Sequence, residues 1–104
     1  MTITSSDIKH VTLNNAAQFL ERYPQNIILP AREHFLALEV GDCLKVGVGE
    51  GPGSEAFWVE IVSIGLPLMV GQIVNHLKFT EVHGLAALDL ILVDPENVIA
   101  IHID

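Results

Sequence analysis

The feature that most constrains this chain is the run from Phe57 to Ile64, which reads FWVEIVSI. It is the longest uninterrupted run of strong β-forming residues and contains the only tryptophan. Because branched and aromatic side chains fit a pleated surface, the run predicts a β-strand. In such a strand Phe57 and Trp58 point to opposite faces, so both faces carry apolar groups. This pattern predicts a central strand in a curled sheet or against a helix.

Residues 1–40 carry helical periodicity. Apolar side chains at helical spacing predict one helix over residues 15–23, ended by Pro24. A second helix is predicted over residues 31–38, after a proline whose missing N–H costs nothing in the first turn of a helix. Residues 1–11 form an extended lead-in, which either contributes a short strand or stays irregular.

From Gly41 onward the periodicity changes to two residues, which is typical of half-buried strands. Loops and turns separate the predicted strands, among them a hairpin loop at residues 49–54 and a turn or single 3₁₀ turn at residues 94–97. The five predicted strands cover residues 43–48, 57–64, 69–77, 88–93 and 99–103.

These elements predict one α+β domain over residues 1–104, a length that suits a single hydrophobic core. Its helical part is residues 1–40, with two short N-terminal helices. Its β part is residues 41–104, with five short antiparallel strands in a curled sheet or small barrel.

Acidic residues outnumber basic residues by thirteen to five, which gives a formal net charge of −8. Residues 41–104 hold nine of the acids against two lysines. A phosphate backbone is bound by clustered Lys and Arg, so direct binding of nucleic acid or of an anionic membrane is not expected. A basic protein partner, or mimicry of nucleic acid, stays open beside the simpler interpretation of a soluble acidic surface.

The single cysteine, Cys43, cannot form an intramolecular disulfide. The N-terminal residues show no basic stretch followed by an apolar run, so no signal peptide is expected, and the longest apolar stretch is too short for a membrane span. These features predict a cytoplasmic protein. Hydrophobic residues make up 50% of the chain, and a homo-oligomer such as a homodimer would cover apolar surface left outside the core.

Three phrases in the β part together resemble a known family. GDCLKVG at residues 41–47, FWVEI at residues 57–61 and HGL at residues 83–85 are similar to a family of small bacterial domains of unknown function with an SH3-like barrel. A proline-containing turn before the last strand, at residues 94–98, fits the same SH3-like plan. The resemblance covers about residues 38–104 and implies this fold but no activity. It does not imply the polyproline groove of SH3 domains, because several aromatic residues line that groove.

No catalytic, cofactor-binding or metal-ligating set is expected. The glycine-rich run at residues 47–53 lacks the Lys-Ser/Thr pair and the following helix of a phosphate loop, so it is interpreted as a hairpin tip. The histidines and Cys43 lack the spacing of metal ligands, and Cys43 has no evident neighbouring base that would make it a nucleophile.

The candidates for protein contact are Trp58, Glu60, Asn75, His76 and His83. Trp58 is expected either in the core or, because tryptophan is enriched at interfaces, as a partly exposed contact residue. Glu60 shares the face of Trp58, where it faces solvent, pairs with Lys45 or Lys78, or acts as an acid in a cleft. The others lie at a strand end and in a turn, where functional residues are often found.

The expected function is a protein-binding accessory or regulatory module of a bacterium or phage, without catalysis. One alternative is an acidic inhibitor of a basic partner, of the immunity, anti-defence or nucleic-acid-mimic type, which predicts carboxylates clustered on one surface. A second alternative is a small enzyme using Glu60, His76 and His83, which predicts that these three side chains converge in one pocket.

Overall fold

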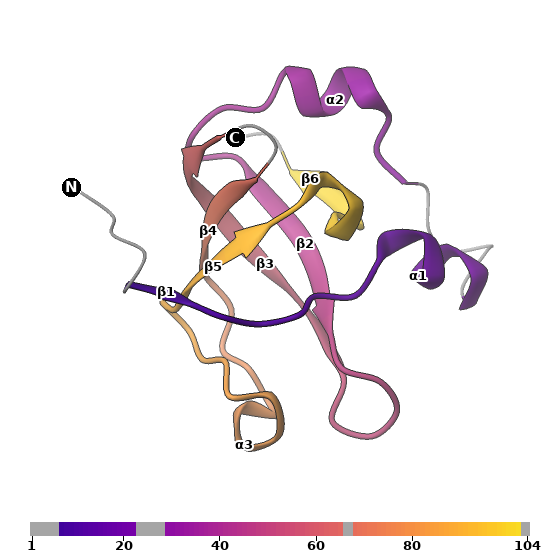
Figure 1. Ribbon diagram of the computed structural model, residues 1–104, viewed down its shortest axis with the longest axis vertical. Coiled ribbons are helices and arrows are strands. Elements are labelled where there is room, and N and C mark those ends of the chain that lie inside the picture. Colours follow the sequence, from indigo (N-terminus) through magenta and orange to yellow (C-terminus); the bar gives the residue numbers. More distant parts are fainter. Residues whose placement is uncertain (1–6, 23–28, 66–67, 103–104) are drawn as a thin grey trace.

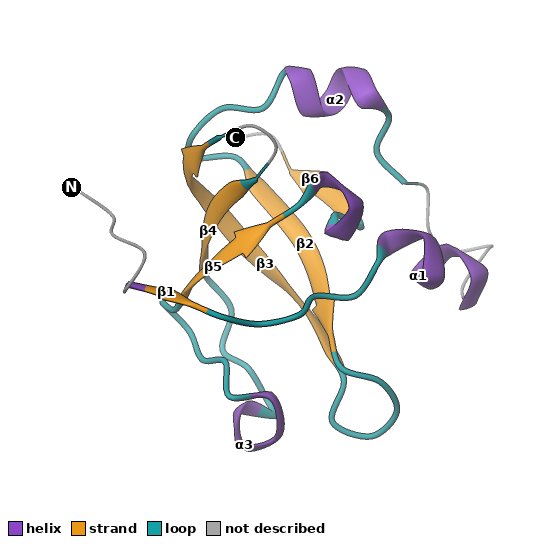
Figure 2. Ribbon diagram, viewed as in Figure 1, coloured by secondary structure: helices purple, strands orange, loops and turns teal. Residues whose placement is uncertain are grey.

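The computed structural model describes residues 7–22, 29–65 and 68–102, which form an α+β fold with one mixed sheet and short helices (Figure 1). The strands cross the middle of the molecule, and the helices labelled α1, α2 and α3 lie at its periphery (Figure 2). The elements in chain order are β1 (Ile8–Lys9), α1 (Ala16–Arg22), α2 (Arg32–Leu36), β2 (Cys43–Val48), β3 (Glu55–Ile64), β4 (Met69–Ile73), α3 (Thr80–His83), β5 (Leu90–Val93), the 3₁₀ helix η2 (Pro95–Asn97) and β6 (Ala100–His102).

The sheet has six strands in the order β1-β5-β4-β3-β2-β6. Strands β2 to β5 form an antiparallel meander, and β6 returns to pair antiparallel with β2. At the other edge β1 pairs with β5 in parallel. The prediction of five antiparallel strands was therefore wrong: the sheet has a sixth strand, β1, which is parallel to its neighbour. The sheet is open rather than a closed barrel.

The central position of β3 is confirmed, because it pairs with β2 on one side and β4 on the other. Phe57, Val59 and Ile61 are buried, whereas Trp58 and Glu60 on the opposite face are half-buried. One face of β3 thus belongs to the core, and the other forms part of the outside of the sheet.

The core fills the concave side of the curled sheet, between the buried faces of the strands. Loop and turn residues close it, with Leu13, Leu38, Leu77 and Leu85 all buried in the same cluster. Gly71 of β4 lies opposite Ile61 of β3, and the Val59 side chain fills the space that a Cβ atom at Gly71 would occupy.

The helices differ from the prediction in number and length. Helix α1 begins one residue after the predicted start, and the predicted end at residue 23 lies outside the described residues. Helix α2 is shorter than its predicted range at both ends. A third helix, α3, forms in the predicted excursion between β4 and β5, so the prediction of two helices was incomplete. Its four residues are too few to show helical periodicity. The longest described helix has seven residues, and none of the described helices has the length and apolar character to span a bilayer.

The bounds of β4 and β5 also differ from the predicted ones. Strand β4 ends at Ile73, and the chain then turns so that Leu77 enters the core. Strand β5 begins at Leu90, because Leu88 has a φ of 74° and cannot continue an extended strand.

The predicted 3₁₀ turn is confirmed: the Asp94 side chain accepts a hydrogen bond from the Glu96 N–H and caps η2. The last predicted strand is described as far as His102, and its end lies outside the described residues.

The N-terminal segment, residues 8–14, runs from one side of the sheet to the other, in front of the strands (Figure 1). It begins in β1 beside β5 and ends at β2, where Leu13 forms a β-bridge with Val48 and the Asn14 N–H donates to the Gly47 carbonyl over 2.9 Å. The Asn97 side chain donates to the Asn14 carbonyl. The segment thereby ties together strands that the open sheet leaves apart.

Candidate functional site

The convex side of the sheet carries a continuous set of side chains that point away from the core, which we call the outer face. Alternation along the strands and the observed register define its members. They are Cys43, Lys45, Trp58, Glu60, Val70, Gln72, Leu90, Leu92, Ala100 and His102. Each of them is half-buried or exposed, so none of the described elements covers this face.

Trp58 lies near the middle of the outer face, between β2 and the end of β4. The Lys45 ammonium, on the opposing β2 residue, is 6.0 Å from the centre of the indole ring, within the range of a cation–π contact. The His102 ring approaches the indole edge-on, with ring centres 6.4 Å apart. The main chain of Trp58 donates to the Asn75 side-chain oxygen and accepts from the Val74 N–H. These contacts hold Trp58 in one place on an otherwise open face.

A shallow hollow of about 380 Å³ lies beside Trp58. Its lining consists of Cys43, Trp58, Val74, Asn75 and His102. An indole and an exposed valine offer apolar contact, while the amide and imidazole offer hydrogen bonds. This combination suits a side chain of another protein, which needs apolar burial with a few polar anchors.

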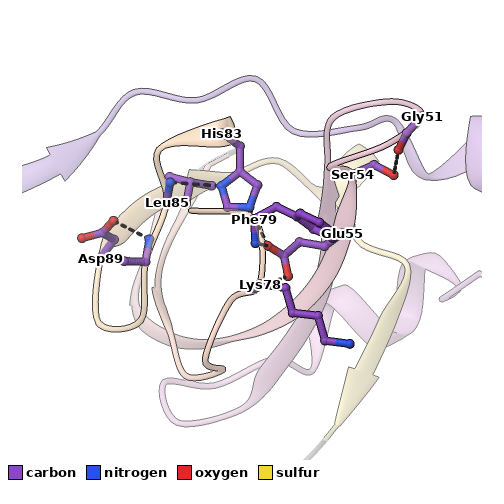
Figure 3. Close-up of polar contacts among 9 residues, drawn as sticks. Gly51, Ser54, Glu55, Lys78, Phe79, His83, Leu85 and Asp89 are labelled. Atoms are coloured by element: carbon purple, nitrogen blue, oxygen red, sulfur yellow. Dashed lines mark hydrogen bonds and ion pairs between the residues drawn. The ribbon is translucent and has the colours of Figure 1, made fainter. Parts of the chain in front are cut away.

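A second polar cluster joins the start of β3 to α3 (Figure 3). The Glu55 carboxylate accepts hydrogen bonds from the main-chain N–H groups of Lys78 and Phe79, over 3.1 and 3.0 Å. The His83 Nε2 lies 2.6 Å from the same carboxylate. Both side chains are largely buried, with exposed fractions of 12% for Glu55 and 5% for His83.

Hydrogen bonds determine the protonation of this cluster. Burial by itself raises the pKa of Glu55, but the hydrogen bonds from His83, Phe79 and Lys78 outweigh burial and hold the pKa below its usual value. The His83 Nδ1 accepts a hydrogen bond from the Leu85 N–H, so the ring proton is on Nε2. Nε2 therefore donates a hydrogen bond to the Glu55 carboxylate. Both ring nitrogens of His83 are therefore occupied by structural bonds, and the cluster holds the α3 loop in place.

The structure brings together only some of the candidate contact residues. Trp58 and Asn75 share the hollow, and Glu60 lies on the same face, two residues further along β3. Its carboxylate forms no ion pair with Lys45 or Lys78. His76 is exposed after the end of β4, and His83 belongs to the α3 cluster. Alternation along β3 places Glu55, the partner of His83, on the core face, so Glu60 and His83 lie on opposite sides of the sheet.

Sequence reasoning missed Glu55, although a signal was present. Glu55 stands two residues before Phe57, so alternation places a carboxylate on the side of the strand that enters the core. A buried carboxylate requires hydrogen-bond donors, which the α3 loop supplies. Val74 and His102 had no comparable signal, because their place beside Trp58 depends on strand pairing.

Within the part of the chain that the structure describes, no three His, Cys, Asp or Glu side chains are grouped so that they could hold a metal ion. A scan against protein-family models and searches of curated proteins and of solved structures found no match to this chain.

Proposed function

We propose that this protein is a binding module that contacts another protein through the outer face, centred on Trp58, and acts as an accessory or regulatory factor rather than as a catalyst. The observation that carries the proposal is the uncovered outer face with a positioned tryptophan beside a hollow. Buried tryptophans dominate binding energy at many interfaces, especially where the surrounding contacts exclude water. An anchored indole also loses little conformational freedom on binding.

We also propose the SH3-like plan for the β part, and with it the likeness to small bacterial domains. Supporting it are the antiparallel meander of β2 to β5, the return of β6 beside β2, and the 3₁₀ turn η2 before the last strand. Strand β1 and helices α1 and α2 are additions to that plan.

The other two functions have less support. Exposed acids on α2 and α3, for example Glu33 and Glu81, belong to elements at opposite ends of the molecule, whereas an inhibitor that mimics nucleic acid needs them on one surface (Figure 1). An enzyme that uses Glu60 together with His83 needs both side chains in one pocket, but they lie on opposite faces of β3.

The proposal is tested by affinity capture from lysate of the source cells with three baits: the natural chain, Trp58→Ala and Val82→Ala. Val82 is an exposed apolar residue of α3, outside the outer face, and serves as the matched control. We expect a protein captured by the natural chain and by Val82→Ala to be lost with Trp58→Ala. Capture that is equal for all three baits would contradict the outer face as the contact surface.

A further inference from the structure

We propose that the occupant of the outer face is a second copy of this chain, packed face to face in a two-fold symmetric dimer. This inference rests on the proposed function and names its partner. Three observations carry it: apolar side chains on neighbouring strands of the outer face, a pair of opposite charges that suits two-fold symmetry, and an exposed leucine held in an unfavourable backbone conformation.

Apolar side chains lie at and next to the outer face near Trp58. The Val74 N–H donates to the Trp58 carbonyl, and both residues line the hollow, so Trp58 and Val74 lie side by side. The Leu88 N–H donates to the Ile73 carbonyl, which places the main chain of Leu88 beside the end of β4. Val74 is 48% exposed and Leu88 is 70% exposed. Further along β4 and β5, Val70 and Leu92 form a cross-strand pair on the same face, and Leu90 lies next to it, opposite Gln72. A large exposed apolar surface marks an association site.

The charges on this face suit self-association. Lys45 lies opposite Trp58, and Glu60 lies opposite Cys43, so the lysine and the glutamate occupy diagonal positions on β2 and β3. A two-fold interface uses the same patch on both copies, so it must be complementary to itself. Consider a two-fold axis that lies in the plane of the interface, midway between Lys45 and Glu60 and perpendicular to the line joining them. This axis places Lys45 of one copy beside Glu60 of the other copy. The same axis passes close to Trp58, so the two indoles and hollows meet at the centre.

Leu88 has the third distinguishing feature. It stands in the turn closed by the hydrogen bond from the Asp89 N–H to the Ala86 carbonyl, with a φ of 74°. A glycine fits this conformation without strain, whereas a leucine does not. No other described residue except glycine has a positive φ. An exposed leucine at a position that favours glycine is explained if its side chain is buried by the second copy.

The test is the oligomeric state of the purified chain by sedimentation velocity between about 1 µM and 1 mM, at about 0.15 M salt. We expect a concentration-dependent dimer. Lys45→Glu and Glu60→Lys each place like charges together, so each should raise the dissociation constant by about tenfold or more. The double variant exchanges the charges and should restore the natural dissociation constant to within about threefold. Leu88→Gly should weaken the dimer while the monomer stays folded, which circular dichroism melting checks for every variant.

A natural chain that stays monomeric over this range would overturn the second copy as occupant. So would a dimer in which the double variant is no tighter than the two single variants. The outcomes separate the two proposals. A monomer whose lysate capture still depends on Trp58 leaves the proposed function standing, whereas a monomer with no capture that depends on Trp58 overturns both.

Discussion

At the scale of single residues, the Glu55 side chain joins the start of β3 to α3 and the residues before it. Its carboxylate accepts hydrogen bonds from two main-chain N–H groups and from His83, and all three donors belong to residues 78–83. Glu55→Gln keeps the shape but replaces one oxygen with a donor, so at least one of these N–H groups loses its acceptor. We expect a loss of about 1–3 kcal/mol in the free energy of unfolding, measured in urea. Glu50→Gln, on the exposed hairpin loop, is the control, and an equal loss in both variants would contradict the role of Glu55.

The lowered pKa of Glu55 predicts a pH dependence. Because the folded-state pKa lies below the usual value of 4.5, folding favours the ionised carboxylate. Its contribution to stability is complete above the unfolded-state pKa and disappears as the pH falls through the folded-state pKa. Between about pH 5 and pH 3 the natural chain should therefore lose more stability than Glu55→Gln. Parallel stability curves for the two proteins would show that Glu55 does not supply this dependence.

Two substitutions of Leu88 separate the stability of the monomer from the strength of the dimer. Leu88→Gly and Leu88→Ala both remove the exposed side chain, but only glycine suits the φ of 74°. We expect Leu88→Gly to be more stable than Leu88→Ala by about 1 kcal/mol, because relief of strain exceeds the entropy that glycine adds to the unfolded chain. Both variants should weaken the dimer. Urea unfolding of the monomers decides the first point, and equal stabilities would mean that the turn is not strained.

At the scale of elements, the packing of β3 against β4 depends on Gly71. A Cβ atom added there would lie 2.7 Å from Val59 Cγ2 and 3.0 Å from Val59 Cβ, which is closer than atoms can pack. Gly71→Ala should therefore cost about 1–3 kcal/mol, measured by urea unfolding. In a Val59→Ala background the same substitution should cost less, because part of the crowding is gone. Equal costs in both backgrounds would place the strain elsewhere.

The N-terminal segment, residues 8–14, is the element that converts an open sheet into a closed core. Leu13 is buried with the strand residues, and Lys9 forms an ion pair with Asp89 at 2.9 Å and donates to the Gly84 carbonyl. The ion pair joins residues 80 positions apart, and the bridge between Leu13 and Val48 also joins the segment to a distant part of the chain. The segment therefore contributes long-range contacts that the short strand β1 alone does not provide.

At the scale of the whole molecule, net charge opposes association. Each copy carries a charge of −8, and the shortest dimension of the molecule, 21 Å, serves as the distance between the two charges. A screened Coulomb estimate then gives a repulsion that is roughly 5 kcal/mol stronger at about 0.01 M salt than at about 0.15 M salt. The Lys45–Glu60 pairs contribute at most about 1 kcal/mol each in the opposite direction. Repulsion dominates, so we expect the dimer to tighten as salt rises over this range. Sedimentation at both salt concentrations measures it, and a dimer that weakens would mean that the ion pairs dominate.

The sequence by itself determined the elements that depend on neighbouring residues. Alternation around Phe57 predicted a central strand, helical spacing predicted α1, and the Asp94–Asn97 turn contains its own cap. In each case the chain within a few positions supplies the cause, namely side-chain periodicity or a local hydrogen bond.

Only the tertiary structure decided which residues form the site. The parallel pairing of β1 with β5 and the contact of Glu55 with His83 join positions far apart in the chain, and such contacts leave no periodic trace in the sequence. The position of Trp58 outside the core was undecided for the same reason. Both faces of its strand are apolar, and the face that becomes buried is the one that the rest of the chain, from Leu13 to Val98, packs against.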